Sequence, residues 1–151
     1  MSHDNEYEYT IKIDYDGFLT RFDINEIIAS IDKAIEEEFL PNYINIESYN
    51  LKNPVFSYVG ITAVDRGSIT LTVMSSSAVF LYVAHHFKNG VDESRLAKEL
   101  ERSGKIAGDL LGSALAKING WAEGYVKKQR VNGGNVKGIS VKRKNKNIPK
   151  P

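Results

Sequence analysis

Apolar and polar residues alternate in the first part of the chain. Between Tyr7 and Tyr15, tyrosines and isoleucines occupy every second position, with polar residues between them. This period of two is typical of a half-buried strand, because successive side chains on a strand point to opposite faces. Asp16-Gly17 then predicts a turn, since glycine tolerates a positive φ. The pattern therefore predicts a first strand over residues 7–15.

The period changes after this turn. From Ile24 to Phe39 the apolar residues are spaced by three or four, which predicts a helix of about four turns with one buried face. Asp23 and Glu26 are three residues apart and resemble a capping box, so the helix is expected to begin there. Pro41 predicts its end, because a proline inside a helix removes a backbone hydrogen bond.

Three consecutive glutamates, at positions 36–38, lie near the C-terminal end of this predicted helix. The helix dipole disfavours exposed anions at that end by roughly 0.3 to 1 kcal/mol. A basic partner nearby would offset this cost, although three exposed glutamates on a solvated face are the more common arrangement. A weaker pattern over residues 43–51 predicts a short strand.

Two strands that follow are predicted to form a hairpin. They span residues 55–64 and 68–74, and Asp65-Arg66-Gly67 between them predicts the turn. The three serines at 75–77 then offer N-caps for a helix over residues 78–88. Because the first part of this helix is apolar on every side, it is expected to be buried in the centre of the fold.

A long helical pattern runs from residue 92 to 129, and the glycine-rich segment 132–135 ends it. Together the elements predict an α+β fold in the order β-α-β-β-α-α. Its small antiparallel sheet of three to four strands would pack with an amphipathic helix, a buried helix and a long glycine-rich helix. We expect a single domain over residues 1–130 and a basic, flexible tail over residues 131–151.

Composition narrows the class of protein further. The chain has 151 residues and is 42% hydrophobic, which suits one ordinary core. It contains no cysteine, so disulfides, thiolate metal sites and cysteine nucleophiles are excluded. Its first ten residues are acidic and polar and do not resemble a secretory signal or a transit peptide. These features predict a cytoplasmic protein.

Charge is distributed unevenly along the chain. Residues 1–50 hold three basic and twelve acidic side chains, whereas residues 127–151 hold nine basic and none acidic. The acidic half can be a solvated surface and the basic end a solubilising tail. Alternatively, the basic end binds an anionic partner or folds back on the acidic region of its own or a neighbouring copy.

Small residues recur at every fourth position of the long helix, and we call this row the small-residue ridge. It consists of Gly104, Gly108, Gly112, Ala116, Gly120 and Gly124. Each glycine inside a helix costs roughly 0.8 to 1 kcal/mol relative to alanine, so the five together cost about 4 to 5 kcal/mol. Something is expected to offset that cost, because small residues allow another backbone to approach closely.

Three explanations of the ridge compete. It can pack against the sheet or central helix of the same chain, or it can pair with the helix of another copy. A membrane-active helix is a third explanation, but charges such as Lys105, Asp109 and Lys117 interrupt the segment. The stretch 69–87 also lacks charged residues and is just long enough to cross a bilayer. Its serines and its change of period favour a strand followed by a buried helix instead.

A search for catalytic or metal-binding patterns nominates no site. His85 and His86 are adjacent, so on a helix they point about 100° apart and cannot share one metal ion. Asp14 and Asp16 share a strand face but are more typical of a turn. No phosphate-binding loop, dinucleotide fingerprint or nucleophile elbow occurs. We therefore expect no catalytic residue, metal or cofactor.

The leading hypothesis is a non-catalytic interaction or regulatory module that self-associates through the small-residue ridge. The second is non-specific nucleic-acid binding through the basic end, by salt-sensitive contacts to phosphates. The residues expected to make those contacts are Lys127, Lys128, Arg130, Lys137, Lys142, Arg143, Lys144 and Lys146. A third hypothesis is a membrane-associated effector. The expected partners are another copy of the chain or another protein, with nucleic acid as the alternative.

Overall fold

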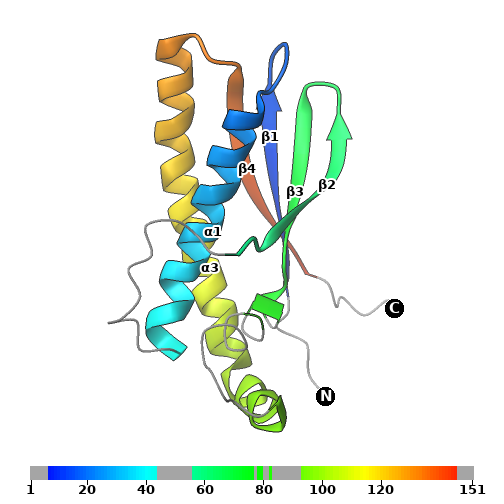
Figure 1. The fold of residues 1–151 in the computed structure, drawn as a ribbon, viewed down its shortest axis with the longest axis vertical. Coiled ribbons are helices and arrows are strands. Elements are labelled where there is room, and N and C mark those ends of the chain that lie inside the picture. Colours follow the sequence, from blue (N-terminus) through cyan, green and yellow to red (C-terminus); the bar gives the residue numbers. More distant parts are fainter. Residues whose placement is uncertain (1–6, 44–55, 77, 80–81, 83–92, 146–151) are drawn as a thin grey trace.

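The computed structural model describes residues 7–43, 56–76, 78–79, 82 and 93–145 (Figure 1). Within these residues the fold combines a four-stranded antiparallel sheet with two long helices, so the predicted α+β class is confirmed. The elements in chain order are β1 (Tyr7–Tyr15), α1 (Arg21–Tyr43), β2 (Val59–Asp65), β3 (Ser68–Val73), α3 (Glu93–Asn132) and β4 (Val136–Asn145).

The strands lie in the order β2-β3-β1-β4, so β1 is central and both β2 and β4 are edge strands. Opposite residues in an antiparallel pair point to the same face of the sheet. Ile11 of β1 lies opposite Leu71 of β3 and Val141 of β4. The period of two along β1 therefore continues across three strands as one apolar face.

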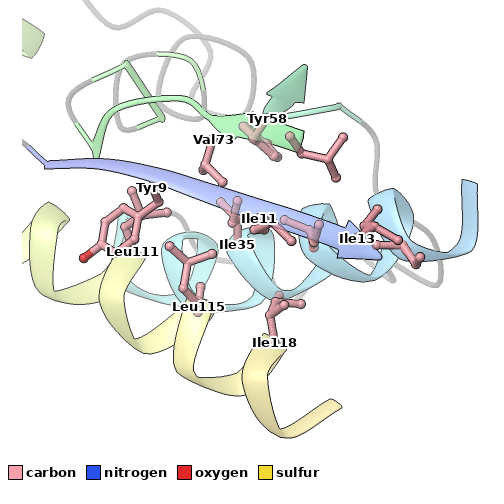
Figure 2. Close-up of a cluster of buried hydrophobic side chains, with 14 of the residues drawn as sticks. Tyr9, Ile11, Ile13, Ile35, Tyr58, Val73, Leu111, Leu115 and Ile118 are labelled. Carbon is pink, nitrogen blue, oxygen red and sulfur yellow. The ribbon is translucent and has the colours of Figure 1, made fainter. Parts of the chain in front are cut away.

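Both helices cover that apolar face and lie next to each other (Figure 1). Figure 2 shows the core between them and the sheet, where Ile11 and Ile13 point from β1 towards Ile35 of α1 and Leu115 of α3. The opposite face carries polar side chains such as Lys12. Such a two-layer arrangement is common for an antiparallel sheet with one solvated face.

The segment predicted to be a flexible tail contributes the fourth strand. Residues 136–145 form β4, which pairs with β1 along its length. The physical reason is that Val136, Ile139 and Val141 align with the apolar positions of β1, although lysines and polar residues separate them in the sequence. Gly133 allows the chain to turn back after α3, because its φ is +71°.

The first helix begins earlier and extends further than its sequence pattern predicts. Thr20, not Asp23, caps it: the Asp23 backbone N–H donates to the Thr20 hydroxyl at 3.1 Å, and that hydroxyl donates to Asp23 Oδ2 at 2.9 Å. Asp23 thus stands three residues after the N-cap, in the place expected for Glu26, and its carboxylate accepts the Thr20 hydroxyl, whereas the acid of a capping box accepts the backbone N–H of the cap. At the other end, Pro41 lies inside α1, which ends at Tyr43. The rest of the strand predicted at 43–51 lies outside the described residues.

The predicted hairpin is confirmed, with β2 beginning at Val59 and a tight turn at Arg66-Gly67. Gly67 has a φ of +86°, which a side chain would disfavour, and its carbonyl accepts the Tyr15 N–H at 3.0 Å. After β3, the Ser75 hydroxyl accepts the Ala78 N–H at 3.2 Å, as the serine cap predicts. Most of the helix predicted at 78–88 lies outside the described residues.

Candidate functional site

The small-residue ridge does not lie on one side of α3. The buried side of the helix is formed by Leu111, Ala114, Leu115, Ile118, Ala122 and Tyr125, which face the sheet and α1. Of the ridge, Gly108 and Gly112 are half-buried, whereas Ala116, Gly120 and Gly124 are exposed. A spacing of four residues advances the helix by about 400°, so the row drifts away from the core. Gly104 belongs to α3, but its surroundings lie outside the described residues.

The glycines differ in what surrounds them. A Cβ added at Gly112 would lie 3.6 Å from the hydroxyl of Tyr9, which is an ordinary contact distance. A Cβ added at Gly120 or Gly124 would have no heavy atom within 4 Å. The folded chain therefore accommodates larger residues at these two positions. Packing within the described part of the chain would let a methyl group at Gly112 contact Tyr9, and it leaves open space at Gly120 and Gly124, so it does not require glycine at any of the three positions.

The exposed side of α3 has a second regularity. Six exposed residues follow one another at alternating spacings of four and three, which is the seam of a heptad pattern. We call this row the α3 seam: Asp109, Ser113, Ala116, Gly120, Glu123 and Lys127. Its two central residues are small and belong to the ridge. Its ends carry opposite charges, and in the described part of the chain no ion pair involves Asp109 or Lys127.

The basic residues expected in the tail lie on two elements. Lys127, Lys128 and Arg130 are exposed on the last turns of α3, and Lys137, Lys142 and Arg143 are exposed on β4. Lys137 forms an ion pair with Asp16. Lys144 belongs to β4, although its side chain is not described, and Lys146 lies outside the described residues.

These cations do not form one surface. Lys142 lies opposite Thr10 and points to the solvated face of the sheet, whereas Arg143 lies opposite Tyr9 and points to the helix side. Between α3 and β4 there is a shallow groove of about 290 Å³, lined in part by Lys127, Arg130 and Ile139. Glu123 also lines this groove and reduces its positive charge.

A buried polar cluster connects α1 to the segment that precedes β2. Asp32 and Glu36 are one helical turn apart, and only 3% and 2% of their surfaces are exposed. The Tyr58 N–H donates to Asp32 Oδ1 at 2.7 Å, and the Tyr58 hydroxyl donates to Glu36 Oε2 at 2.9 Å. The Phe56 N–H also donates to Glu36 Oε2, at 3.3 Å. Both carboxylates thus accept hydrogen bonds from residues that lie 20 or more positions away.

Burial, with a smaller contribution from the nearby Glu36 carboxylate, raises the pKa of Asp32 to about 6, although hydrogen bonds from Tyr58 and Ser57 oppose the change. Burial and the same glutamate also raise the pKa of the Tyr58 hydroxyl. The Tyr58 hydroxyl therefore remains a hydrogen-bond donor at physiological pH. Asp32, in contrast, can exchange a proton near neutral pH.

The three glutamates at positions 36–38 do not all lie on a solvated face, which was the more common arrangement. Glu37 is exposed, but Glu36 is buried in the polar cluster, and Glu38 accepts an ion pair from Lys117 of α3 at 2.8 Å. That hydrogen bond raises the pKa of Lys117. A basic partner of the glutamates therefore exists, and it comes from the other helix.

Sequence reasoning did not find the polar cluster. Its only local signal is that Asp32 falls between Ile31 and Ile35, in a helix whose apolar side is buried. The partners of Asp32 come from the segment before β2, and no pattern within α1 indicates them.

The other two aspartates considered in the sequence, Asp14 and Asp16, form ion pairs with Lys12 and Lys137, respectively.

Apolar side chains are exposed at the end of the sheet that carries the β2–β3 turn. Phe18 and Phe22, at the start of α1, have 70% and 76% of their surfaces exposed, and Val64 near the turn has 68% exposed. Large exposed apolar side chains are typical of surfaces that contact other molecules when they form a patch.

Within the described residues, no group of three His, Asp or Glu side chains gathers as metal ligands do. His85 and His86 lie outside them. No described helix has the length and apolar character needed to cross a bilayer. The uncharged stretch 69–87 begins as a strand, because residues 69–73 belong to β3.

Comparisons with protein-family models, curated proteins and solved structures found no match. A functional proposal for this chain therefore rests on its own sequence and geometry.

Proposed function

We propose that this chain is a non-catalytic protein-interaction module that self-associates through the α3 seam. The observation that carries the proposal is Gly120, an exposed glycine at the centre of the seam; Gly124, about one turn further along α3, is also exposed but lies outside the seam. Each costs roughly 0.8 to 1 kcal/mol relative to alanine, and no described contact within the chain requires either to be small. A second helix that approaches the backbone closely would require small residues there.

The charges of the seam favour an antiparallel arrangement of two copies. If two seams run in opposite directions, Asp109 of one copy lies near Lys127 of the other, and Ala116 lies near Gly120. A parallel arrangement would place Asp109, Glu123 and Lys127 against the same residues of the partner, and like charges repel. Antiparallel and parallel pairs can both have the two-fold symmetry of most homodimers, so the charges alone select the orientation.

The proposal retains the interaction and cytoplasmic assignments predicted from the sequence. The lack of cysteine supports the compartment. The ridge residues Gly104 and Gly108 precede the seam, so the contact we propose is centred on Ala116 and Gly120.

The first test is the molar mass of the intact chain, measured by light scattering after size exclusion at several protein concentrations. We expect a discrete dimer that a Gly120→Leu substitution converts to monomer. Asn119→Leu is the matched control, because Asn119 is exposed on the same helix but lies outside the seam. A wild-type chain that is monomeric at every concentration, or equal effects of the two substitutions, would overturn the proposal.

A charge-swap experiment tests the orientation. Asp109→Lys and Lys127→Asp should each weaken the dimer, and the double substitution should restore it if the seams are antiparallel. In a parallel pair the double substitution would not restore the dimer. Phe22→Ser provides a further control, since a dimer that depends on Phe22 instead would place the interface at the exposed apolar end of the sheet.

Nucleic-acid binding is a second candidate, favoured by the exposed cations Lys127 and Arg130 beside the groove between α3 and β4. Binding of this kind weakens steeply as salt rises. A gel shift with single- and double-stranded DNA and RNA at low salt tests it. Substituting both cations with glutamine should abolish the shift, and a full-length chain that shifts none of these probes would remove the candidate.

A further inference from the structure

The entry to strand β2 is held against α1 by buried carboxylates. Tyr58 is fully buried, and its N–H donates to Asp32 while its carbonyl accepts the Met74 N–H at 2.8 Å. The residue thus connects α1, the entry to β2 and the end of β3. The ring of Tyr58 also packs edge-on against Tyr82, at 5.9 Å between ring centres.

Among the described residues, the charged or titratable groups that face Asp32 come from two segments. Glu36 comes from α1, and the Tyr58 hydroxyl and the Ser57 side chain come from the β2 entry. In the described part of the chain, no ion pair involves Asp32. A carboxylate in such surroundings loses solvation without gaining a cation, so its neutral form is favoured while the site stays closed.

We propose that Asp32 acts as a proton-dependent latch: its neutral form keeps the β2 entry, residues 56–58, docked against α1, and its ionised form weakens that docking. The geometry supplies the mechanism. When the entry is docked, Asp32 is shielded from water; when the entry detaches, water reaches the carboxylate and stabilises its charge. The carboxyl itself gains and loses the proton, and the solvent is the source and the acceptor.

The direction of the pH dependence follows from linkage. The pKa of Asp32 is about 6 in the docked state, against an ordinary value of 3.8 when it is exposed. The docked state therefore binds more protons between these values, and docking is strongest at low pH and weakens as pH rises through the folded pKa. The same relation predicts a roughly tenfold rise in the opening equilibrium between about pH 5 and about pH 7.

The proposed latch lies next to an edge strand, so its opening would affect an exposed part of the sheet. Strand β2 follows the docked segment directly, and β3 is the one described strand that pairs with it. Its residues 59–64 carry no charge, and Ile61 and Val64 are exposed. Uncharged edges of this kind are able to pair with other strands. Release of the entry at higher pH would loosen this edge, independently of the α3 seam.

Amide hydrogen exchange of the intact chain, followed by mass spectrometry at about pH 5 and about pH 7, tests the latch. The exchange rates are divided by the intrinsic rates at each pH to give protection factors. We expect the protection of a peptide covering residues 56–65 to fall roughly tenfold between the two conditions, while a core peptide covering 111–125 changes little. In Asp32→Asn the protection of the first peptide should be the same at both pH values.

Glu37→Gln is the matched control, because it removes a carboxylate from the same helix at an exposed position. It should behave as the wild type. Equal pH dependence in wild type and Asp32→Asn, or protection that rises with pH, would overturn the proposal. If Asp32→Asn does not fold, the proposal is tested instead by NMR titration of the Asp32 carboxyl carbon in the wild-type chain. A midpoint near 6 supports the latch, whereas a midpoint below about 4 contradicts it.

Discussion

Helices α1 and α3 cover the same face of the sheet, but each departs from the ordinary amphipathic pattern in its own way. Helix α1 places the carboxylates of Asp32 and Glu36 on its buried side. Helix α3 places Gly120 and Gly124 on its exposed side, where larger residues would fit. Both features lower the stability of the folded chain, because burying a carboxylate and placing glycine inside a helix are each unfavourable.

The difference lies in where the compensating contacts are found. The carboxylates of α1 accept hydrogen bonds from residues 56 and 58, so their partners lie within the same chain. For the two exposed glycines of α3, no neighbouring atom in the described chain explains their size. Departures from local rules concentrate at functional positions. We propose that in α1 the departure controls a segment of the same chain, and that in α3 it serves a contact with another copy.

The largest effect is expected on the buried side of α3. Leu115 is 2% exposed and packs in the core, so Leu115→Ala removes apolar contacts and leaves a cavity. Such substitutions cost about 2 to 5 kcal/mol in the free energy of unfolding. Urea denaturation followed by circular dichroism measures this loss. Asn119→Ala, on the exposed side and outside the α3 seam, is the control and should change stability by less than about 0.5 kcal/mol. If the two substitutions had similar effects, the assignment of Leu115 to the buried side of α3 would be contradicted.

The next effect is expected on the buried side of α1 and has the opposite sign. Asp32→Asn replaces an acid whose pKa is raised to about 6 with a neutral side chain that still accepts the Tyr58 N–H. Ionisation of the wild-type carboxyl opposes folding above that pH, so the variant should be more stable at pH 7, by about 1 to 3 kcal/mol. Below about pH 3 the advantage should disappear, because the wild-type carboxyl is then neutral in both states. Urea denaturation across this pH range provides the measurement, and a variant less stable than wild type at pH 7 would contradict the prediction.

Elements with a strong period could be predicted from the sequence, and elements defined by distant partners could not. Strand β1 alternates over nine residues, and α3 keeps a helical period throughout, so both were predicted close to their observed bounds. Strand β4 was missed because lysines dominate its composition. Its apolar positions, such as Ile139 and Val141, become recognisable only when they are aligned with β1.

The candidate sites show the same limit. The spacing of the small-residue ridge could be predicted from the sequence, but not which of its members face solvent, because that depends on where the core lies. Leu111 and Leu115 define the core side only after α3 is packed on the sheet. Asp32 could not be recognised as buried, since Tyr58 lies 26 residues away and a helical aspartate is usually exposed. Burial of a polar group is a property of the tertiary structure.

A smaller effect is expected at the start of α1. The Thr20 hydroxyl accepts the Asp23 N–H, which would otherwise lack a helical partner. Thr20→Ala should lower the free energy of unfolding by about 1 kcal/mol, the typical value of an N-cap. Ser30→Ala serves as the control, because Ser30 lies within the same helix and its hydroxyl bonds only the preceding turn. Thermal denaturation compares the two, and an unchanged midpoint in Thr20→Ala would show that Thr20 does not cap the helix.

The smallest expected change in stability is at Gly124, an exposed glycine of α3. It is compared with Gly133, where the backbone conformation favours glycine. At Gly124 the backbone is helical and the added Cβ has open space, so Gly124→Ala should stabilise the monomer by about 0.5 to 1 kcal/mol. At Gly133 the φ is +71°, and Gly133→Ala should destabilise the chain by about 1 to 2 kcal/mol because L-residues disfavour this region. Urea denaturation at a protein concentration low enough to keep the chain monomeric measures both. If Gly124→Ala also lost stability under these conditions, a contact within the chain would account for that glycine, and only Gly120 in the α3 seam would remain as support for self-association.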